Sequence, residues 1–313
     1  CARPWHLPEY LHHTNWTVRE MSKFIVRRDT ERPAFWYMSF SAPHPPLVPP
    51  ADYLEMYRHI EIDEPFMGEW AQDVSKIPYA LRQRRQGIGS YSDTEIRIAR
   101  QALYAMSTHV DHQIRLIIGL LREEGLIDNT IIMFTADHGD MLGDHGLLEK
   151  RAFYDGSARV PLLVRVPWLS EGQTRIPGSI GQIDLVPTLL DLVGESIPDH
   201  LQGNSKASVL RGEMTLENND VFVQWNGKGD RDLGTPTINE MIALPRRTIV
   251  SGDRWKLNLC DGDEGELFDL TSDPHELRNL FTDLGQSERI GSMAARLRAW
   301  QEETGDTAPL PAV

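Results

Sequence analysis

Asn129-Thr-Ile-Ile-Met-Phe-Thr-Ala-Asp-His-Gly-Asp-Met-Leu-Gly-Asp-His-Gly-Leu-Leu-Glu-Lys150 is the stretch of sequence that decides the fold. Its apolar run, residues 131–136, predicts a strand, and Asp137 and His138 follow where that strand would end. In parallel α/β sheets, ligands bind beyond the carboxyl ends of the strands. A carboxylate beside an imidazole suits a divalent cation such as Ca²⁺, Mn²⁺, Mg²⁺ or Zn²⁺. The stretch therefore predicts a metal-binding pair, although Asp-His-Gly by itself would also cap a turn.

Strand and helix patterns alternate on both sides of this stretch. Short apolar runs typical of strands buried on both faces occupy residues 34–40, 131–136 and 160–166. Apolar residues at helical spacing predict helices over residues 14–28, 92–125 and 183–193. The first would have Thr14 or Asn15 as its N-cap, and the second starts with the capping-box pattern Ser92-Asp-Thr-Glu95. This alternation predicts an α/β fold with a mostly parallel, doubly wound sheet.

The pattern of predicted secondary structure changes near residue 218. Short strand candidates separated by turns occupy residues 220–225, 240–243, 247–251 and 255–260, and a helix is predicted over residues 287–303. Short strands joined by turns favour an antiparallel sheet. We therefore expect a main α/β domain over residues 1–217 and a small C-terminal α+β subdomain over residues 218–313.

Composition and charge exclude several classes of function. The 313 residues carry a formal net charge of −14, which argues against a nucleic-acid partner, because that surface needs Lys and Arg to neutralise phosphates. With Cys1 and Cys260 as its two cysteines, the sequence predicts neither a disulfide framework nor a cysteine-based zinc site. Apolar runs all fall short of the roughly 20 residues of a membrane span, so no membrane association is expected. The cellular compartment and homo-oligomerisation stay open.

Other polar residues are candidates for a role near the metal pair. His44 lies in the proline-rich segment 41–50, which would hold it rigidly at a strand end, and Lys150 offers a positive charge for an anion. His44 could instead only fill space in its turn. Asp140, Asp144 and His145 more simply shape the loop through hydrogen bonds, and Asp111 and His112 are expected as partners within the long helix.

These residues carry a resemblance to the sulfatase family within the alkaline-phosphatase superfamily. The similar motifs lie at residues 35–50, 129–161, 182–191 and 266–280, in the family's order. The resemblance implies that Asp137 and His138 bind the active-site cation, for which we expect calcium, with manganese as the alternative. It implies that Lys150 contacts the sulfate oxygens and the leaving oxygen, and that His44 hydrogen-bonds or protonates the leaving group. His44 and Lys150 would thus be both catalytic and substrate-binding residues.

The sequence also departs from the family pattern. The family's segment Cys-x-Pro-Ser-Arg, whose cysteine becomes formylglycine, has no match here, and Arg3 and Trp5 after Cys1 do not fit it. We therefore do not expect Cys1 to be the nucleophile. We expect instead that the sequence is the C-terminal portion of a longer enzyme, that formylglycine and further acidic ligands belong to its N-terminal section, and that the chain alone has little activity and exposes apolar surface.

The sequence thus predicts a metal-dependent hydrolase of sulfuric esters, with a small sulfate ester or a sulfated glycan as substrate. Two alternatives remain. One is a phosphonate or phosphate ester hydrolase of the same superfamily, and the other is a truncated, non-catalytic anion-binding protein. Residues 60–90 and 226–240 are our candidates for the rim that selects the substrate.

Overall fold

The computed structural model describes residues 2–73, 77–78, 91–150, 152–169, 172–227, 239 and 243–313. The chain forms two compact units. The first consists of Cys1–Glu64, Tyr91–Phe134 and Leu163–Ser170, and the second of Pro65–Ser90, Thr135–Leu162 and Glu171–Val313. Cys1, most of the candidate strand 240–243 and much of both predicted rim segments lie outside the described residues.

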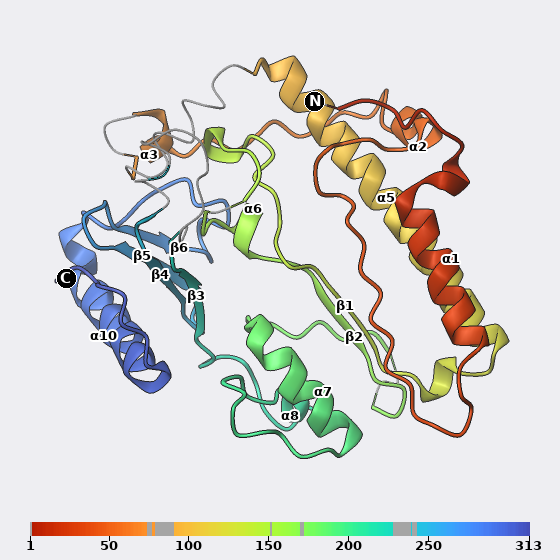
Figure 1. Ribbon diagram of the computed structural model, residues 1–313. Helices are drawn as coiled ribbons and strands as arrows, with labels where there is room; N and C mark the ends of the chain where they lie inside the picture. Colours follow the sequence, from red (N-terminus) through yellow and green to blue (C-terminus); the bar gives the residue numbers. More distant parts are fainter. Residues whose placement is uncertain are drawn as a thin grey trace. The chain divides into compact units, whose positions relative to one another are not determined.

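Helices dominate the first unit. Its helical elements are η1 (Glu9–Leu11), α1 (His13–Val26), α2 (Ala51–Met56), α5 (Asp93–Glu123) and η3 (Ile127–Asn129). In Figure 1, α1 lies along α5, and Val18 and Ile25 pack against Ile117 and Leu121. The capping box of Ser92 and Glu95 is present as predicted. The N-cap of α1, however, is His12, whose side chain accepts a hydrogen bond from the amide of Thr14, so both predicted N-cap residues lie inside the helix.

Two strands, β1 (Ile132–Thr135) and β2 (Leu162–Arg165), form a two-stranded sheet. Both were predicted, but burial on both faces was wrong, since Leu163 is 59% exposed. Residues 34–40 belong to no helix or strand, which corrects the third predicted strand.

The segment 34–40 nevertheless has the alternation of an extended chain. Trp36, Met38 and Phe40 pack into the cluster between α1 and α5, whereas Phe35 and Tyr37 are 80% and 79% exposed. Successive side chains of an extended segment point to opposite faces, so a helical layer on one side covers only every second residue. The expected exposed apolar surface is thus found at Phe35 and Tyr37.

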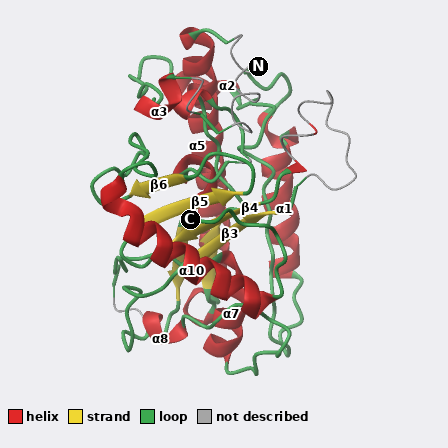
Figure 2. Cartoon of the chain, turned by 90° about the vertical axis from the view of Figure 1, so that its left-hand side faces the viewer, coloured by secondary structure: helices red, strands yellow, loops and turns green. Residues whose placement is uncertain are grey.

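The second unit contains a four-stranded antiparallel sheet in the order β3 (Val221–Trp225), β4 (Arg246–Val250), β5 (Trp255–Cys260) and β6 (Glu266–Asp269). The antiparallel arrangement was predicted. Figure 2 shows the predicted C-terminal helix, α10 (Ser287–Thr304), lying across these strands. The boundary between residues 217 and 218 stays a prediction.

The two faces of this sheet differ in polarity. Ile249, Leu257 and Leu267 pack with Met293 and Leu297 of α10. The register places Thr248 opposite Asn258 and Asn258 opposite Glu266, so these side chains share the other face with Lys256. One face is therefore an apolar core, and the other face buries polar and charged groups.

Short elements complete the second unit: α3 (Glu69–Gln72), η4 (Asp144–Gly146), α6 (Asp155–Ala158), η5 (Gln182–Asp184), α7 (Leu185–Val193), α8 (Ala207–Leu210) and η6 (Leu284–Gln286). The predicted helix over residues 183–193 is found as α7, with Pro187 in its first turn and Gly194 ending it in the left-handed conformation. Helices and strands together confirm the predicted α/β class.

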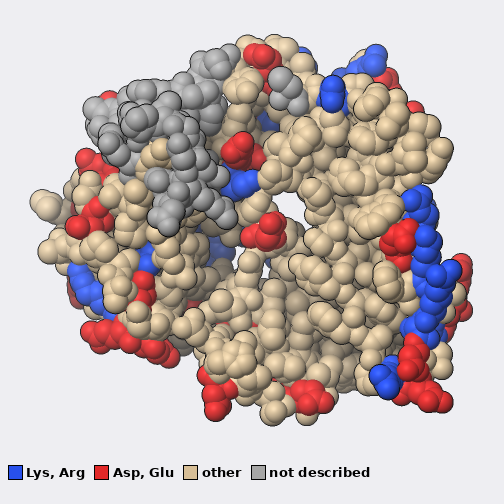
Figure 3. Space-filling model, viewed as in Figure 1, with Lys and Arg blue, Asp and Glu red and all other residues tan. Residues whose placement is uncertain are grey.

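Charges of both signs are mixed on the described surface. Figure 3 shows acidic and basic side chains side by side along α1, where Glu20 pairs with Lys23 at 2.8 Å and lies 3.8 Å from Arg19. Among the described residues, none of the helices has the length and apolar content that crossing a membrane requires.

A buried histidine cluster was not predicted from the sequence. The rings of His12 and His109 are fully buried with their centroids 4.8 Å apart, and His13 stacks on His12 at 4.2 Å. Burial, reinforced by the neighbouring imidazoles, lowers the pKa of both His12 and His109 from 6.5 to about 4. A carboxylate oxygen of Glu9 lies 3.5 Å from Nε2 of His109 and does not reverse this. Tyr53 and His112 also lie beside the cluster.

We expect the first unit to lose stability in acid. Because the two pKa values are lower in the folded chain, the unfolded chain binds more protons between pH 6.5 and about 4, so the stabilisation is present above pH 6.5 and is lost as the pH falls. The loss should be about 2–3 kcal/mol for each imidazole. Urea unfolding measured at a series of pH values would detect it.

The double variant His12→Asn and His109→Gln is the control, because Asn can still cap α1 and Gln can still bond to Asn15. Its free energy of unfolding should vary much less between pH 6.5 and 4. An equally steep loss in the variant would contradict this assignment.

Candidate functional site

Asp137 and His138 follow β1 directly and belong to the second unit. Oδ1 of Asp137 accepts a hydrogen bond from the amide of His138 at 3.0 Å. Oδ2 of Asp137 lies 3.7 Å from Nε2 of His138, and the Asp137 side chain is largely exposed. A backbone hydrogen bond thus turns the carboxylate toward the imidazole.

The histidine ring has a defined orientation. Nδ1 of His138 lies 2.7 Å from the carbonyl oxygen of Gly139, and because a carbonyl can only accept, Nδ1 carries the proton. In the neutral ring the lone pair is then on Nε2, the atom nearer Asp137. A histidine that binds a metal through one nitrogen commonly donates from the other to a backbone carbonyl.

These two residues fit one divalent cation. Two ligand atoms about 2.4 Å from a calcium ion and separated by about 90–100° lie roughly 3.4–3.7 Å apart, in keeping with the 3.7 Å between Asp137 Oδ2 and His138 Nε2. Within the described ranges, no group of three or more His, Cys, Asp and Glu side chains is arranged to hold a metal. The pair alone could therefore supply only part of a coordination sphere.

Lys150 lies at the end of the loop that follows the pair and is half-buried. The preceding residue, Glu149, has a φ of 65°. Its amide donates to Oδ1 of Asp140 at 3.0 Å, and its carbonyl accepts from Met141 at 2.8 Å. These bonds hold a non-glycine residue in the left-handed region and so fix the backbone that carries Lys150.

His44 belongs to the first unit and is exposed. Its amide donates to Ser41 at 3.0 Å, and its Nδ1 lies 2.7 Å from the carbonyl oxygen of Pro45, so Nδ1 carries the proton here too. The proline-rich turn thus orients His44 as expected. Asp137, His138 and Lys150 all belong to the second unit, and the roles of all four residues stay predictions.

The loop between the metal pair and α6 is closed at its base. The amide of Gly139 donates to the carbonyl of Ser157 at 2.8 Å. A Cβ atom on Gly139 would collide with the carbonyl oxygen of Gly156, so this close approach requires glycine. Within the loop, Oδ1 of Asp140 also accepts from Leu142 at 2.9 Å. We call the paired residues 139 and 156–157 the neck of the loop.

Asp144 and His145 shape the same loop, as expected. Oδ1 of Asp144 accepts from the amide of Phe66 at 3.0 Å, and Nδ1 of His145 accepts from the amide of Gly68 at 3.1 Å. The His145 ring is buried beside Trp70. Both residues therefore tie the loop to the segment around residue 66. Similarly, His112 in α5 lies 3.3 Å from the hydroxyl of Tyr53, in keeping with its expected structural role.

Gln182 holds the backbone next to the metal pair, and these contacts were not predicted from the sequence. Its Nε2 donates to the carbonyls of Ala136 at 2.7 Å and Asp137 at 3.1 Å. It thereby fixes the backbone at the end of β1. The signal was its place at the start of a motif shared with the sulfatases, but the sequence did not show which atoms it would contact. Asp184 is the N-cap of α7, but its side chain accepts a hydrogen bond from the amide of Asn204 and none from the helix.

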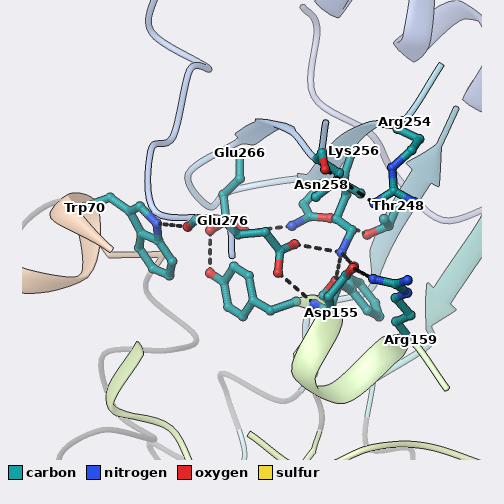
Figure 4. Close-up of polar contacts among 12 residues, drawn as sticks. Trp70, Asp155, Arg159, Thr248, Arg254, Lys256, Asn258, Glu266 and Glu276 are labelled. Carbon is teal, nitrogen blue, oxygen red and sulfur yellow. Dashed lines mark hydrogen bonds and ion pairs between the residues drawn. The ribbon is translucent and has the colours of Figure 1, made fainter. Parts of the chain in front are cut away.

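A buried polar network holds residues 153–155 at the start of α6, and it too was not predicted from the sequence (Figure 4). Nζ of Lys256 donates to Oδ1 of Asp155 at 2.5 Å, Oε1 of Glu276 at 2.7 Å and the carbonyl of Phe153 at 3.0 Å. Oε2 of Glu276 accepts from the amide of Asp155 at 2.7 Å. Trp70 donates to the carbonyl of Glu276 at 2.8 Å.

A second chain of hydrogen bonds lies beside the first. Tyr154 donates its hydroxyl to Glu266 at 2.5 Å, Asn258 donates to the other oxygen of Glu266 at 3.0 Å, and Thr248 donates to Asn258 at 2.7 Å. Burial raises the pKa of Glu266 from 4.5 to about 7, and these hydrogen bonds only partly oppose it. Burial and the Glu266 charge raise the pKa of the Tyr154 hydroxyl well above 10.

Lys256 is ionised although it is only 1% exposed. Burial alone would lower its pKa, but the Glu276 and Asp155 carboxylates outweigh this and the pKa is raised. Burial also raises the pKa of Glu276, against the effect of the Lys256 ammonium. Because the ammonium contacts both carboxylates directly, we assign the ionised state to the whole group.

Comparisons with known proteins show the family of this chain. A model of the sulfatase family matches residues 2–195, and a model described as N-sulphoglucosamine sulphohydrolase, C-terminal, matches residues 143–303. An arylsulfatase of Clostridium perfringens is 35% identical over 92% of this chain and 58% of that protein. The N-acetylglucosamine-6-sulfatase of Bos taurus is 27% identical over 93% of this chain and 55% of that protein.

The fold is likewise similar to a solved structure, the phosphonate monoester hydrolase of Agrobacterium radiobacter. The TM-score is 0.82 at 25% identity, covering 96% of this chain and 62% of that one. The predicted fold type is thereby confirmed. The chain spans about half the length of the curated relatives it matches.

Gly139→Ala tests the closed neck. Because the added methyl group would overlap the carbonyl oxygen of Gly156, the free energy of unfolding should fall by about 2–3 kcal/mol. Gly291→Ala in α10 is a matched control, since a methyl group there would have no neighbour within 4 Å beyond its own helix backbone, and the helix should gain about 0.5–1 kcal/mol. Urea unfolding measures both. Equal effects of the two substitutions would show that the neck is not tightly packed.

Proposed function

The chain belongs to the sulfatase family, and from this premise we propose that it acts as a metal-dependent hydrolase of sulfuric esters. The observation that carries the proposal is the pair Asp137 and His138, oriented toward one another at the end of β1. Lys150 follows in the same unit, on a loop whose base is closed by hydrogen bonds. A cation site and a lysine carried by the same loop would together suit an anionic tetrahedral substrate.

Each residue has a role set by its chemistry. Asp137 and His138 would hold a divalent cation, calcium or alternatively manganese, and that cation would withdraw charge from the sulfate oxygens. Lys150 places an ammonium against a sulfate oxygen and the leaving oxygen. By resemblance to the family, His44 would hydrogen-bond or protonate the leaving oxygen. By the same resemblance, we propose formylglycine as the nucleophile.

The substrate class we propose is a sulfate monoester, either a small molecule or a sulfated glycan. The similarity to a relative named N-acetylglucosamine-6-sulfatase supports the glycan. A second candidate is a phosphonate monoester, because the phosphonate monoester hydrolase shares the fold at 25% identity. Both substrates present a tetrahedral anion.

Paired substrates distinguish the two reactions. The protein expressed from its complete open reading frame should hydrolyse 4-nitrophenyl sulfate with a higher kcat/KM than the matching phenylphosphonate ester. Release of nitrophenol measures both. The reverse preference would favour the phosphonate hydrolase, and turnover of neither ester would refute catalysis on simple aryl esters.

Substitutions separate the roles of the metal pair and the lysine. Asp137→Ala should lose the divalent cation and nearly all turnover, because it removes a ligand. Lys150→Ala should keep the cation and lose about 100-fold or more in kcat, because it removes only a charge that stabilises the transition state. Metal content by plasma mass spectrometry and steady-state kinetics give the two readouts.

Asp199→Ala is the control for a lost carboxylate, since Asp199 is exposed and lies outside the site. It should retain both cation and turnover. Loss of the cation to the same extent in the Asp137 and Lys150 variants would contradict the roles assigned here.

A further inference from the structure

We propose that Lys256 and Glu276 are positioning residues of the active site, which hold the neck of the metal-pair loop from the buried polar face of the C-terminal sheet. They lie on β5 and in the segment after β6, and neither is adjacent in sequence to the site. This inference rests on the proposed function for its kinetic consequence. Its structural part stands on contacts within the second unit alone.

Their contacts converge on the start of α6. Lys256 holds the carbonyl of Phe153 and the carboxylate of Asp155, while Glu276 accepts from the Asp155 amide. The ion pair of Lys256 and Glu276 therefore holds three groups of residues 153–155: one carbonyl, one carboxylate and one amide. Figure 4 shows Asp155 on α6 facing Lys256 and Glu276, with the sheet behind them.

The effect passes to the metal pair through the backbone. Asp155 is followed by Gly156 and Ser157, which form one side of the neck, and Gly139 on the other side follows His138 directly. The carbonyl of Gly139 is the group that orients the His138 ring. A shift of residues 155–157 would therefore move Gly139 and turn the imidazole away from Asp137.

The chemistry of the network favours positioning over stability. Lys256 and Glu276 are 1% and 2% exposed at their side chains, and burying such charges has a desolvation cost that apolar residues of similar volume avoid. The ion pair provides hydrogen bonds, which have a defined direction. The Lys256 ammonium donates three of them, and the Glu276 carboxylate accepts from two donors. An apolar core cannot fix the direction of a backbone carbonyl and amide in this way.

The test compares two buried cations of the same sheet. Arg247 is 2% exposed, pairs with Asp306 and lies on the α10 face of β4, so Arg247→Met removes a similar ion pair without touching the neck. Lys256→Met and, as a milder change, Glu276→Gln alter the proposed network. We would measure amide hydrogen exchange of Gly139 by NMR in each variant, relative to the amide of Leu257 in the centre of the sheet.

Relative exchange of Gly139 should rise about tenfold or more in Lys256→Met, rise less in Glu276→Gln, and stay within about twofold in Arg247→Met. In the complete enzyme, kcat/KM for an aryl sulfate should fall about tenfold or more in Lys256→Met only, as expected when reacting groups are misplaced. Unchanged relative exchange in both network variants, or an equal rise in Arg247→Met, would overturn the inference. If the unmodified enzyme hydrolyses no sulfate ester, the proposed function fails, and the exchange ratios still decide the positioning role.

Discussion

The hydrogen bond from the Gly139 amide to the Ser157 carbonyl is the constraint on which the candidate site depends. It joins two points 18 residues apart, one next to the metal pair and one in the first turn of α6. Lys150 lies between these two points, on a loop whose ends are fixed by this hydrogen bond. Fixing the ends limits the freedom of the loop, and internal bonds to Asp140 remove more of it. A lysine, normally mobile, thus projects from a defined backbone.

The parts that could be predicted from the sequence are those with a local pattern. The capping box at Ser92 and the apolar run before Asp137 depend on residues within one turn or one strand, and both elements are found. The short strand candidate at residues 255–260, bounded by turns, is likewise found as β5. The prediction that residues 34–40 are buried on both faces was wrong, because a continuous apolar run does not show whether one or both faces are covered.

What the sequence could not show are contacts between distant residues. Lys256 meets Asp155 across 101 positions and Glu276 across 20, and nothing near any of them marks it as buried. Lysine and glutamate are usually exposed and are fully buried almost only when their charges are paired, so the sequence would predict Lys256 and Glu276 at the surface. His12 and His109 are a similar case, because residues 1–13 have no periodicity from which to infer burial.

The buried Glu266 beside Tyr154 gives the second unit a proton balance opposite to that of the first. Its pKa is raised from 4.5 to about 7, so the folded chain binds the extra proton, and the stabilisation present below pH 4.5 is lost as the pH rises through 7. His12 and His109 act in the reverse direction. Through these three groups, a fall in pH from 7 to about 5 should destabilise the first unit and stabilise the second.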